Sequence, residues 1–196
     1  MEKTTFDLTL TLLEPMLGTV PKDKEVFKTY VASKHPEGAG DEEVESVEDL
    51  EEKGWTGFHI GEDGKPFIYD YMIKGFLKAA GNTLKDQLKV KALKSKIDNF
   101  VFVFPRVIPL PCSIDESPLE RPLRAMTPRG ERVALARSDT VPAGIEFKCQ
   151  IVLLKHKEVK EKILREVLDY GALKGLGQWR NASYGRFSYE MVKVEE

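Results

Sequence analysis

The sequence predicts an α+β protein in which helices cover one face of an antiparallel sheet. Residues 6–12 and 145–153 alternate between apolar and polar side chains, the period of a half-buried strand. Residues 69–80 and 159–168 instead repeat apolar side chains every three or four positions, as amphipathic helices do. With two further strands the predicted order is strand, helix, strand, strand, helix, strand. This is the ferredoxin-like, or RRM-like, βαββαβ plan, which leaves the second face of the sheet free for a ligand.

The segment after the first strand is predicted to be an insertion at about residues 31–65. It is rich in glycine and strongly acidic, with eight Asp and Glu residues between Asp41 and Glu52. Such a composition buries little apolar surface, so only a short helix near residues 47–52 is expected there.

The first predicted helix has its apolar face at Ile73 and Leu77, and Lys74 and Lys78 stand one turn apart on another face. Gly81-Asn82 is predicted to end this helix, and Thr83 to cap a second one that runs to about Ala92. The second helix is expected to add lysines to the same patch. These lysines are Lys85, Lys89, Lys91, Lys94 and Lys96.

Phe100–Phe104 is apolar on both faces and predicts a central strand that is covered on both sides. The prolines at 105, 109 and 111 are then expected to keep the chain out of regular pairing.

Residues 112–140 are predicted to form an arginine-rich hairpin arm with its turn at Thr127–Gly130. Its arginines are Arg121, Arg124, Arg129, Arg132 and Arg137. So many arginines on a projecting arm suit contact with a phosphate backbone.

The loop at residues 175–187, between the last predicted helix and strand, has the composition of a binding loop. Glycines allow positive φ and close approach to a ligand, arginines form planar forks for phosphate, and aromatic rings stack on bases. Two plainer interpretations stay open: Gly175 is a helix cap, and Trp179 anchors the core at the helix end.

The net charge of −2 conceals an uneven distribution. Residues 1–64 contain 6 Lys/Arg and 16 Asp/Glu, whereas residues 65–196 contain 24 and 16, so the two parts carry −10 and +8. The second part is therefore expected to attract polyanions, unless its charges only solvate the surface. No apolar run is long enough to cross a bilayer and no signal peptide is evident, so we expect a cytoplasmic protein.

Neither a cofactor nor a metal is expected. Cys112 and Cys149 lack CxxC spacing, and the chain has no P-loop, HExxH or GxSxG motif.

Three stretches resemble the RAMP superfamily, the repeat-associated proteins that form backbone and RNA-processing subunits of CRISPR effector complexes. They are Ile73–Lys78, Val141–Phe147 and the glycine-rich run Gly175–Phe187, and they occur in the expected order at positions that span most of the chain from Pro66 onward. The resemblance implies a single domain over residues 1–196 that holds single-stranded RNA, within a ribonucleoprotein or multimer of a prokaryotic cell. Departures from the family's pattern, such as Lys78 in place of the usual arginine, suggest a divergent member, a stand-alone or phage-encoded relative.

The candidate nucleic-acid-binding residues come from the first helix, the arm and the glycine-rich loop. They are Lys74, Lys78, Arg121, Arg124, Arg129, Arg132, Gly175, Gly177, Trp179, Arg180, Tyr184, Gly185 and Arg186. The lysines and the loop arginines are expected to converge on the open face of the sheet.

Two alternatives remain open at this point. The acidic stretch could mimic nucleic acid, which would make the chain a protein-interaction component or a viral inhibitor that copies a complex subunit. A metal-independent endoribonuclease would need a general base, and His35 and His59 are the weak candidates.

Overall fold

The main sheet has four antiparallel strands, and its two middle strands are distant in sequence. The computed structural model describes residues 1–22, 55–114, 118–127 and 130–194, without the side chains of 123–134. The strands are β1 (Lys3–Leu12), β7 (Val101–Phe104), β12 (Glu146–Leu154) and β13 (Phe187–Lys193). Their order is β13-β1-β12-β7. Leu8 pairs with Cys149 on one side and Met191 on the other, so the buried positions of neighbouring strands coincide.

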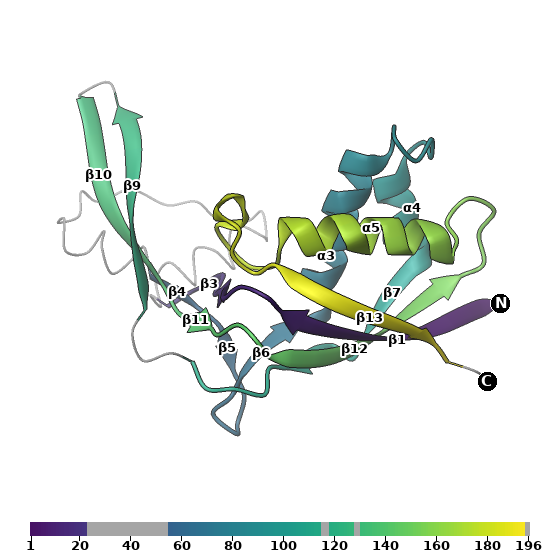
Figure 1. The fold of residues 1–196 in the computed structure, drawn as a ribbon, viewed down its shortest axis with the longest axis horizontal. Coiled ribbons are helices and arrows are strands. Elements are labelled where there is room, and N and C mark those ends of the chain that lie inside the picture. Colours follow the sequence, from purple (N-terminus) through teal and green to yellow (C-terminus); the bar gives the residue numbers. More distant parts are fainter. Residues whose placement is uncertain (23–54, 115–117, 128–129, 195–196) are drawn as a thin grey trace, which may run out of the picture.

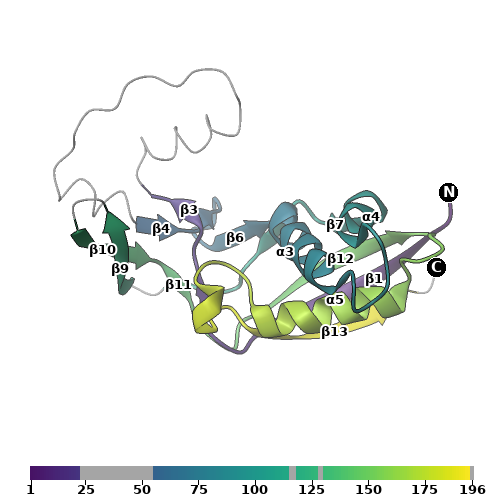
Figure 2. The ribbon, with the colours of Figure 1, turned by 90° about the horizontal axis from the view of Figure 1, so that it is seen from above.

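Three helices lie on the apolar face of this sheet (Figures 1 and 2). They are α3 (Asp70–Leu84), α4 (Leu93–Phe100) and α5 (Glu161–Lys174). Ile73 and Leu77 of α3 and Leu164 of α5 are buried, as their spacing predicts. Asp7, Lys148 and Glu190 are exposed on the opposite face. The protein is thus α+β, with its core between the sheet and the helices.

A second sheet carries the predicted arm. It joins β3 (Val20–Pro21), β4 (Trp55–Gly57), β10 (Gly130–Ser138) and β9 (Leu119–Thr127) in that order. The β9–β10 hairpin projects away from the helices (Figure 1). At its base β10 runs parallel to β4. A short pair, β2 (Met16–Leu17) with β11 (Thr140–Val141), links this region to the end of β1.

A third, three-stranded sheet follows the order β5 (His59–Ile60), β6 (Pro66–Tyr69) and β8 (Val107–Pro109). The prolines after Phe104 therefore do not exclude pairing, because Pro109 lies at the end of a short strand opposite Phe67. Within the predicted insertion, residues 55–57 and 59–60 form strands, and Phe58 between them is buried. The acidic run and the short helix expected near residues 47–52 lie outside the described residues.

The predicted boundary between the first helix and the lysine-rich second helix is wrong. Helix α3 continues through Gly81 and Asn82 to Leu84, and Thr83 donates a hydrogen bond to the Ala79 carbonyl instead of capping a new helix. Gly81 is buried against α4, where a larger side chain would have to displace the end of the Ile97 side chain. Close packing of two helices, not a chain break, explains this glycine.

The interpretation of Phe100–Phe104 as a central strand is also wrong. β7 is an edge strand of the main sheet, with Val101 and Val103 buried. Phe102 and Phe104 are 39% and 50% exposed on the other face. The sequence pattern therefore reflects an aromatic surface at the sheet edge.

Two helical glycines give a matched test of the packing. A methyl group at Gly171 would run into the Phe76 ring, where α5 meets α3, whereas one at Gly75 would meet nothing within 4 Å. Gly171→Ala should lower the free energy of unfolding by about 1 kcal/mol or more, because overpacking outweighs better helix propensity. Gly75→Ala should raise it by about 0.5–1 kcal/mol. Urea denaturation measures both, and equal effects would contradict the packing.

Candidate nucleic-acid interface

The glycine-rich loop is held against the chain itself. Gly177 and Gly185 have φ of 78° and 69°, and a side chain at either would collide with a backbone carbonyl, that of Leu17 or Leu176. The Gly185 N–H donates to the Pro15 carbonyl at 2.8 Å, and the Gln178 N–H to the Leu17 carbonyl at 3.3 Å. These glycines therefore allow the loop to pack on the segment after β1.

Gly175 ends α5, and its N–H bonds to the Gly171 carbonyl at 2.8 Å. The plain helix-cap interpretation of this glycine therefore applies as well.

The aromatic side chains of the loop stack on each other. The rings of Trp179 and Tyr184 are 5.3 Å apart and inclined by 9°. Between them runs a short 3₁₀ helix, Arg180–Ala182, and both Trp179 and Ser183 beside it have positive φ. Trp179 is 41% exposed, so it is not the core anchor that the alternative interpretation required. A stacked, half-open aromatic pair is a suitable platform for a nucleobase.

Arg121 contacts this aromatic pair from the base of the arm. Its guanidinium is 4.8 Å from the Trp179 ring centroid and donates to Gln178 Oε1 at 3.0 Å. The residue is only 9% exposed, and burial lowers the pKa of its guanidinium. Arg121 therefore joins β9 to the glycine-rich loop from the inside, instead of projecting from the arm.

A polar cluster that the sequence analysis missed fixes the base of the arm beside Arg121. The Asp139 carboxylate is 3% exposed; it accepts a hydrogen bond from Trp55 Nε1 at 2.9 Å and pairs with Lys22 Nζ at 2.8 Å. Thr56 and Ser138 share a hydroxyl hydrogen bond of 2.9 Å. Lys22 and Asp139 lie just outside strands, and the other members come from two strands that are distant in sequence, so no local sequence pattern pointed to them.

Lys74 and Lys78 face α4 and β7. Lys74 Nζ donates to the carbonyls of Asp98 and Val101 and lies 4.9 Å from the Phe102 ring centroid. Burial lowers the pKa of Lys74. Lys78 pairs with the Asp98 carboxylate at 2.9 Å, and that hydrogen bond lowers the pKa of Asp98.

The loop arginines lie elsewhere, so the predicted convergence of lysines and arginines is not found. Arg180 lines a hollow with Gly75 and Ala79 on another side of α3. Arg186 is half-buried, and its Nε has no hydrogen-bond partner among the described residues. In the arm, Arg124 pairs with Val133 and Arg132 with Ala125 through the backbone. Arg129 and His35 lie outside the described residues.

His59, a weak candidate for a catalytic base, belongs to an aromatic row on the third sheet. Its ring stacks on Phe67 at 5.4 Å and meets the edge of Tyr69 at 4.8 Å, and Tyr69 stacks on Tyr71. Arg106 lies over Tyr69 at 5.4 Å. Burial lowers the pKa of His59, so the imidazole is neutral at pH 7. Within the described ranges no three His, Cys, Asp or Glu side chains are grouped to hold a metal ion.

Comparison with known proteins finds a likeness of fold without a likeness of sequence. No family model matches the chain, and no curated protein matches it. A chain of the type III-B Cmr-beta complex, solved by cryo-EM bound to cognate target RNA, superposes with a TM-score of 0.51 at 13% identity. The match covers 98% of this protein and 61% of that chain, so this protein spans about three-fifths of its length.

A chain of a type IV-B CRISPR complex gives a TM-score of 0.49 at 14% identity, covering 96% and 90% of the two chains. The Cmr-beta comparison shows that this protein shares the fold of that chain. No helix in the described part of the chain is both long and apolar enough to span a membrane.

We expect removal of Arg121 to free the Trp179 ring. The chain has two tryptophans, Trp55 and Trp179; because Trp55 is present in every protein compared, a difference in acrylamide quenching reports a change in the exposure of Trp179. Arg121→Ala should increase the quenching constant of Trp179. The substitution removes the hydrogen bond to Gln178 and the cation–π contact with the Trp179 ring, and such a contact contributes about 0.5–1 kcal/mol or more. Arg137→Ala is the matched control, since Arg137 pairs with Glu120 at the same end of the hairpin. Equal quenching in both variants would contradict this role.

The lowered pKa of His59 predicts an acid-sensitive third sheet. Because the unfolded chain binds a proton at His59 more readily than the folded one, stability falls as the pH drops from 7 through 6.5 and below. His59→Gln should lose less stability between pH 7 and pH 5 than the wild type. Urea denaturation across this range measures the difference, and parallel pH profiles would refute the assignment.

Proposed function

We propose that this protein binds single-stranded RNA as a CRISPR-associated protein of the RAMP type, within a ribonucleoprotein or multimer. The observation that carries the proposal is the stacked Trp179–Tyr184 pair, held half-open at the base of the arm. Aromatic faces stack on any base, so this site suits a strand bound without reading its sequence.

The fold supports the same proposal. We interpret the main sheet as ferredoxin-like, because the elements β1, α3, β7, β12, α5 and β13 follow the βαββαβ order. The likeness in fold to a Cmr-beta chain, in a complex that holds target RNA, points in the same direction. Residues 1–196 then form one domain with an insertion at about 31–65 and an arm at about 112–140, located in the cytoplasm of a prokaryotic cell or a phage-infected host.

In the proposed mode of binding, a base stacks on the exposed part of the Trp179–Tyr184 pair and a neighbouring phosphate meets Arg180. Arg124, Arg129 and Arg132 of the arm supply further positive charge for the backbone. Arg121 acts as a positioning residue, because its buried guanidinium holds Trp179 and Gln178 at the base of the arm. Lys74 and Lys78 contribute less, since their ammonium groups already have partners within the protein.

The aromatic row on the third sheet favours a second candidate, a protein-interaction component of such a complex. Tyr71 and Val107 are 49% and 45% exposed there. The charges around this row are mixed, with Glu62 and Asp63 near Lys65 in the β5–β6 turn and Arg106 paired with Asp70 at 3.9 Å. An aromatic surface surrounded by charges of both signs suits a protein partner or a second copy of the chain better than a polyanion.

RNA affinity at two salt concentrations tests the main proposal. Fluorescence anisotropy with a labelled single-stranded RNA should give binding that weakens steeply from 50 to 200 mM salt. Trp179→Ala should weaken binding at both concentrations by about 5- to 100-fold, as loss of one base stack does. Arg180→Ala should reduce the slope of log affinity against log salt by about 1.

Lys85→Ala, which removes an exposed lysine outside this site, is the charge-matched control and should change neither quantity. If the protein does not bind the RNA, or if all variants bind it as tightly as the wild type, the RNA proposal is refuted and the protein-interaction candidate is left.

A further inference from the structure

A hollow of about 260 Å³ lies between α3 and the glycine-rich loop, next to the aromatic pair of the candidate interface. Arg180, which lines it, follows Trp179 directly in the chain, and Cα atoms of consecutive residues are only about 3.8 Å apart. The hollow is slightly smaller than the cavities of about 300–1,000 Å³ that hold drug-sized ligands. It therefore suits a single flat group of the size of a nucleobase.

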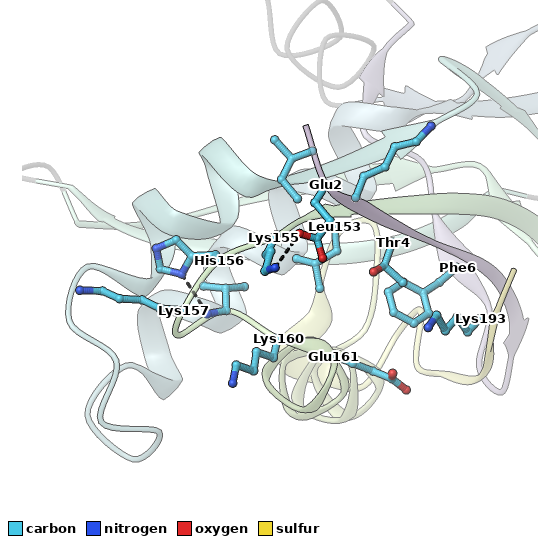
Figure 3. Close-up of a pocket in the computed structure, with 13 residues that line it drawn as sticks. Glu2, Thr4, Phe6, Leu153, Lys155, His156, Lys157, Lys160, Glu161 and Lys193 are labelled. Carbon is cyan, nitrogen blue, oxygen red and sulfur yellow. Dashed lines mark hydrogen bonds and ion pairs between the residues drawn. The ribbon is translucent and has the colours of Figure 1, made fainter. Parts of the chain in front are cut away.

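A larger cavity of about 510 Å³ lies at the opposite end of the main sheet, where β1 begins and β13 ends. Lys157 and Lys160 are directed away from it, and Lys155 pairs with Glu2 (Figure 3). The charged groups of that cavity therefore do not define a ligand, whereas those of the hollow beside α3 do.

Small residues of α3 open this hollow. Gly75 and Ala79, one turn apart, are both exposed, and a methyl group at Gly75 would meet nothing within 4 Å. Gly81 and Gly171, in contrast, lie against side chains of a neighbouring helix. Glycine weakens a helix interior relative to alanine, and packing within the chain does not explain it at position 75. A ligand that occupies the open space would explain it.

The walls of the hollow are apolar. Phe76 and Leu176 are 6% and 4% exposed, and Met72 is half-buried in the same lining. A benzyl ring, an isobutyl group and a thioether make favourable contacts with an aromatic ring. The walls therefore suit a planar aromatic ligand.

Arg180 supplies the charge of this site, and no other charged residue that the structure describes lines the hollow. It is half-buried, and its side chain forms neither a hydrogen bond nor an ion pair with any described residue. An aromatic ring joined to an anion complements both the walls and the guanidinium, and a nucleotide is such a group. An apolar protein side chain would fill the walls but leave Arg180 without a counter-charge.

We propose that one base of the bound strand turns out of the stack on Trp179 and Tyr184 and lies in this hollow, with its phosphate at Arg180. Single-stranded RNA is commonly held with some of its bases splayed out in this way. The inference rests on the proposed RNA binding, and adds to it a second base contact on the other side of Arg180.

Gly75→Leu fills the hollow and tests this placement. Fluorescence anisotropy with a labelled single-stranded RNA should show binding weakened about 5-fold or more, because one base contact is lost. Asn82→Leu places the same side chain at an exposed position of α3 outside the hollow, and should leave the affinity unchanged. Both variants should melt no lower than the wild type, because leucine is a better helix former than glycine or asparagine.

2-Aminopurine reports on the base itself, because its fluorescence is quenched within a stack and rises when the base is unstacked. In a set of short RNAs that each carry it at one position, fluorescence should rise when the wild type binds, and Gly75→Leu should abolish this rise.

The outcomes separate this inference from the proposed function. Full RNA affinity of Gly75→Leu, an equal loss in Asn82→Leu, or no rise in fluorescence would overturn the hollow as a base site, while RNA binding would stand. If the wild type does not bind RNA, both are refuted. If Gly75→Leu keeps its RNA affinity but loses self-association in sedimentation, the hollow holds a protein side chain and the base proposal is overturned.

Discussion

The arrangement of the candidate interface depends on one close backbone contact. Gly185 and Gly177 lie so near the carbonyls of Leu176 and Leu17 that no other residue fits at either position. This contact closes the glycine-rich loop on itself and on the segment that follows β1. That segment also pairs with β11. The contact therefore holds together the end of α5, the start of β13 and the base of the arm. The exposed Trp179 ring therefore sits on a rigid support.

A buried arginine completes this support at an energetic cost. Arg121 is desolvated, and its Nε and Nη1 have no hydrogen-bond partner among the described residues. Gln178 and the Trp179 ring only partly compensate for the lost water. A fold that tolerates this cost at the root of a projecting hairpin gains a defined orientation of the arm relative to the loop.

Charge composition alone was a poor guide to the location of binding sites. The excess of positive charge after residue 65 is divided between two uses. Lys74 and Lys78 bond carbonyls and a carboxylate between α3 and α4, where they stabilise the helix pair. The side chains of Lys157 and Lys160, just before α5, have no hydrogen-bond or ion-pair partner among the described residues. A count of charges cannot separate these uses, because the distinction lies in which groups the fold places within about 4 Å of each other.

Local patterning by itself determined the main secondary structure: the alternation in β1 and β12, the amphipathic faces of α3 and α5, and the β9–β10 hairpin are all predicted and found. These features depend on side-chain periodicity, which neighbouring residues in sequence specify. Tertiary structure alone decided that Gly81 lies inside a helix, that Phe102 is on an edge strand, and that Arg121 is buried. Each outcome depends on a contact with a residue far along the chain, and no local pattern encodes such a contact.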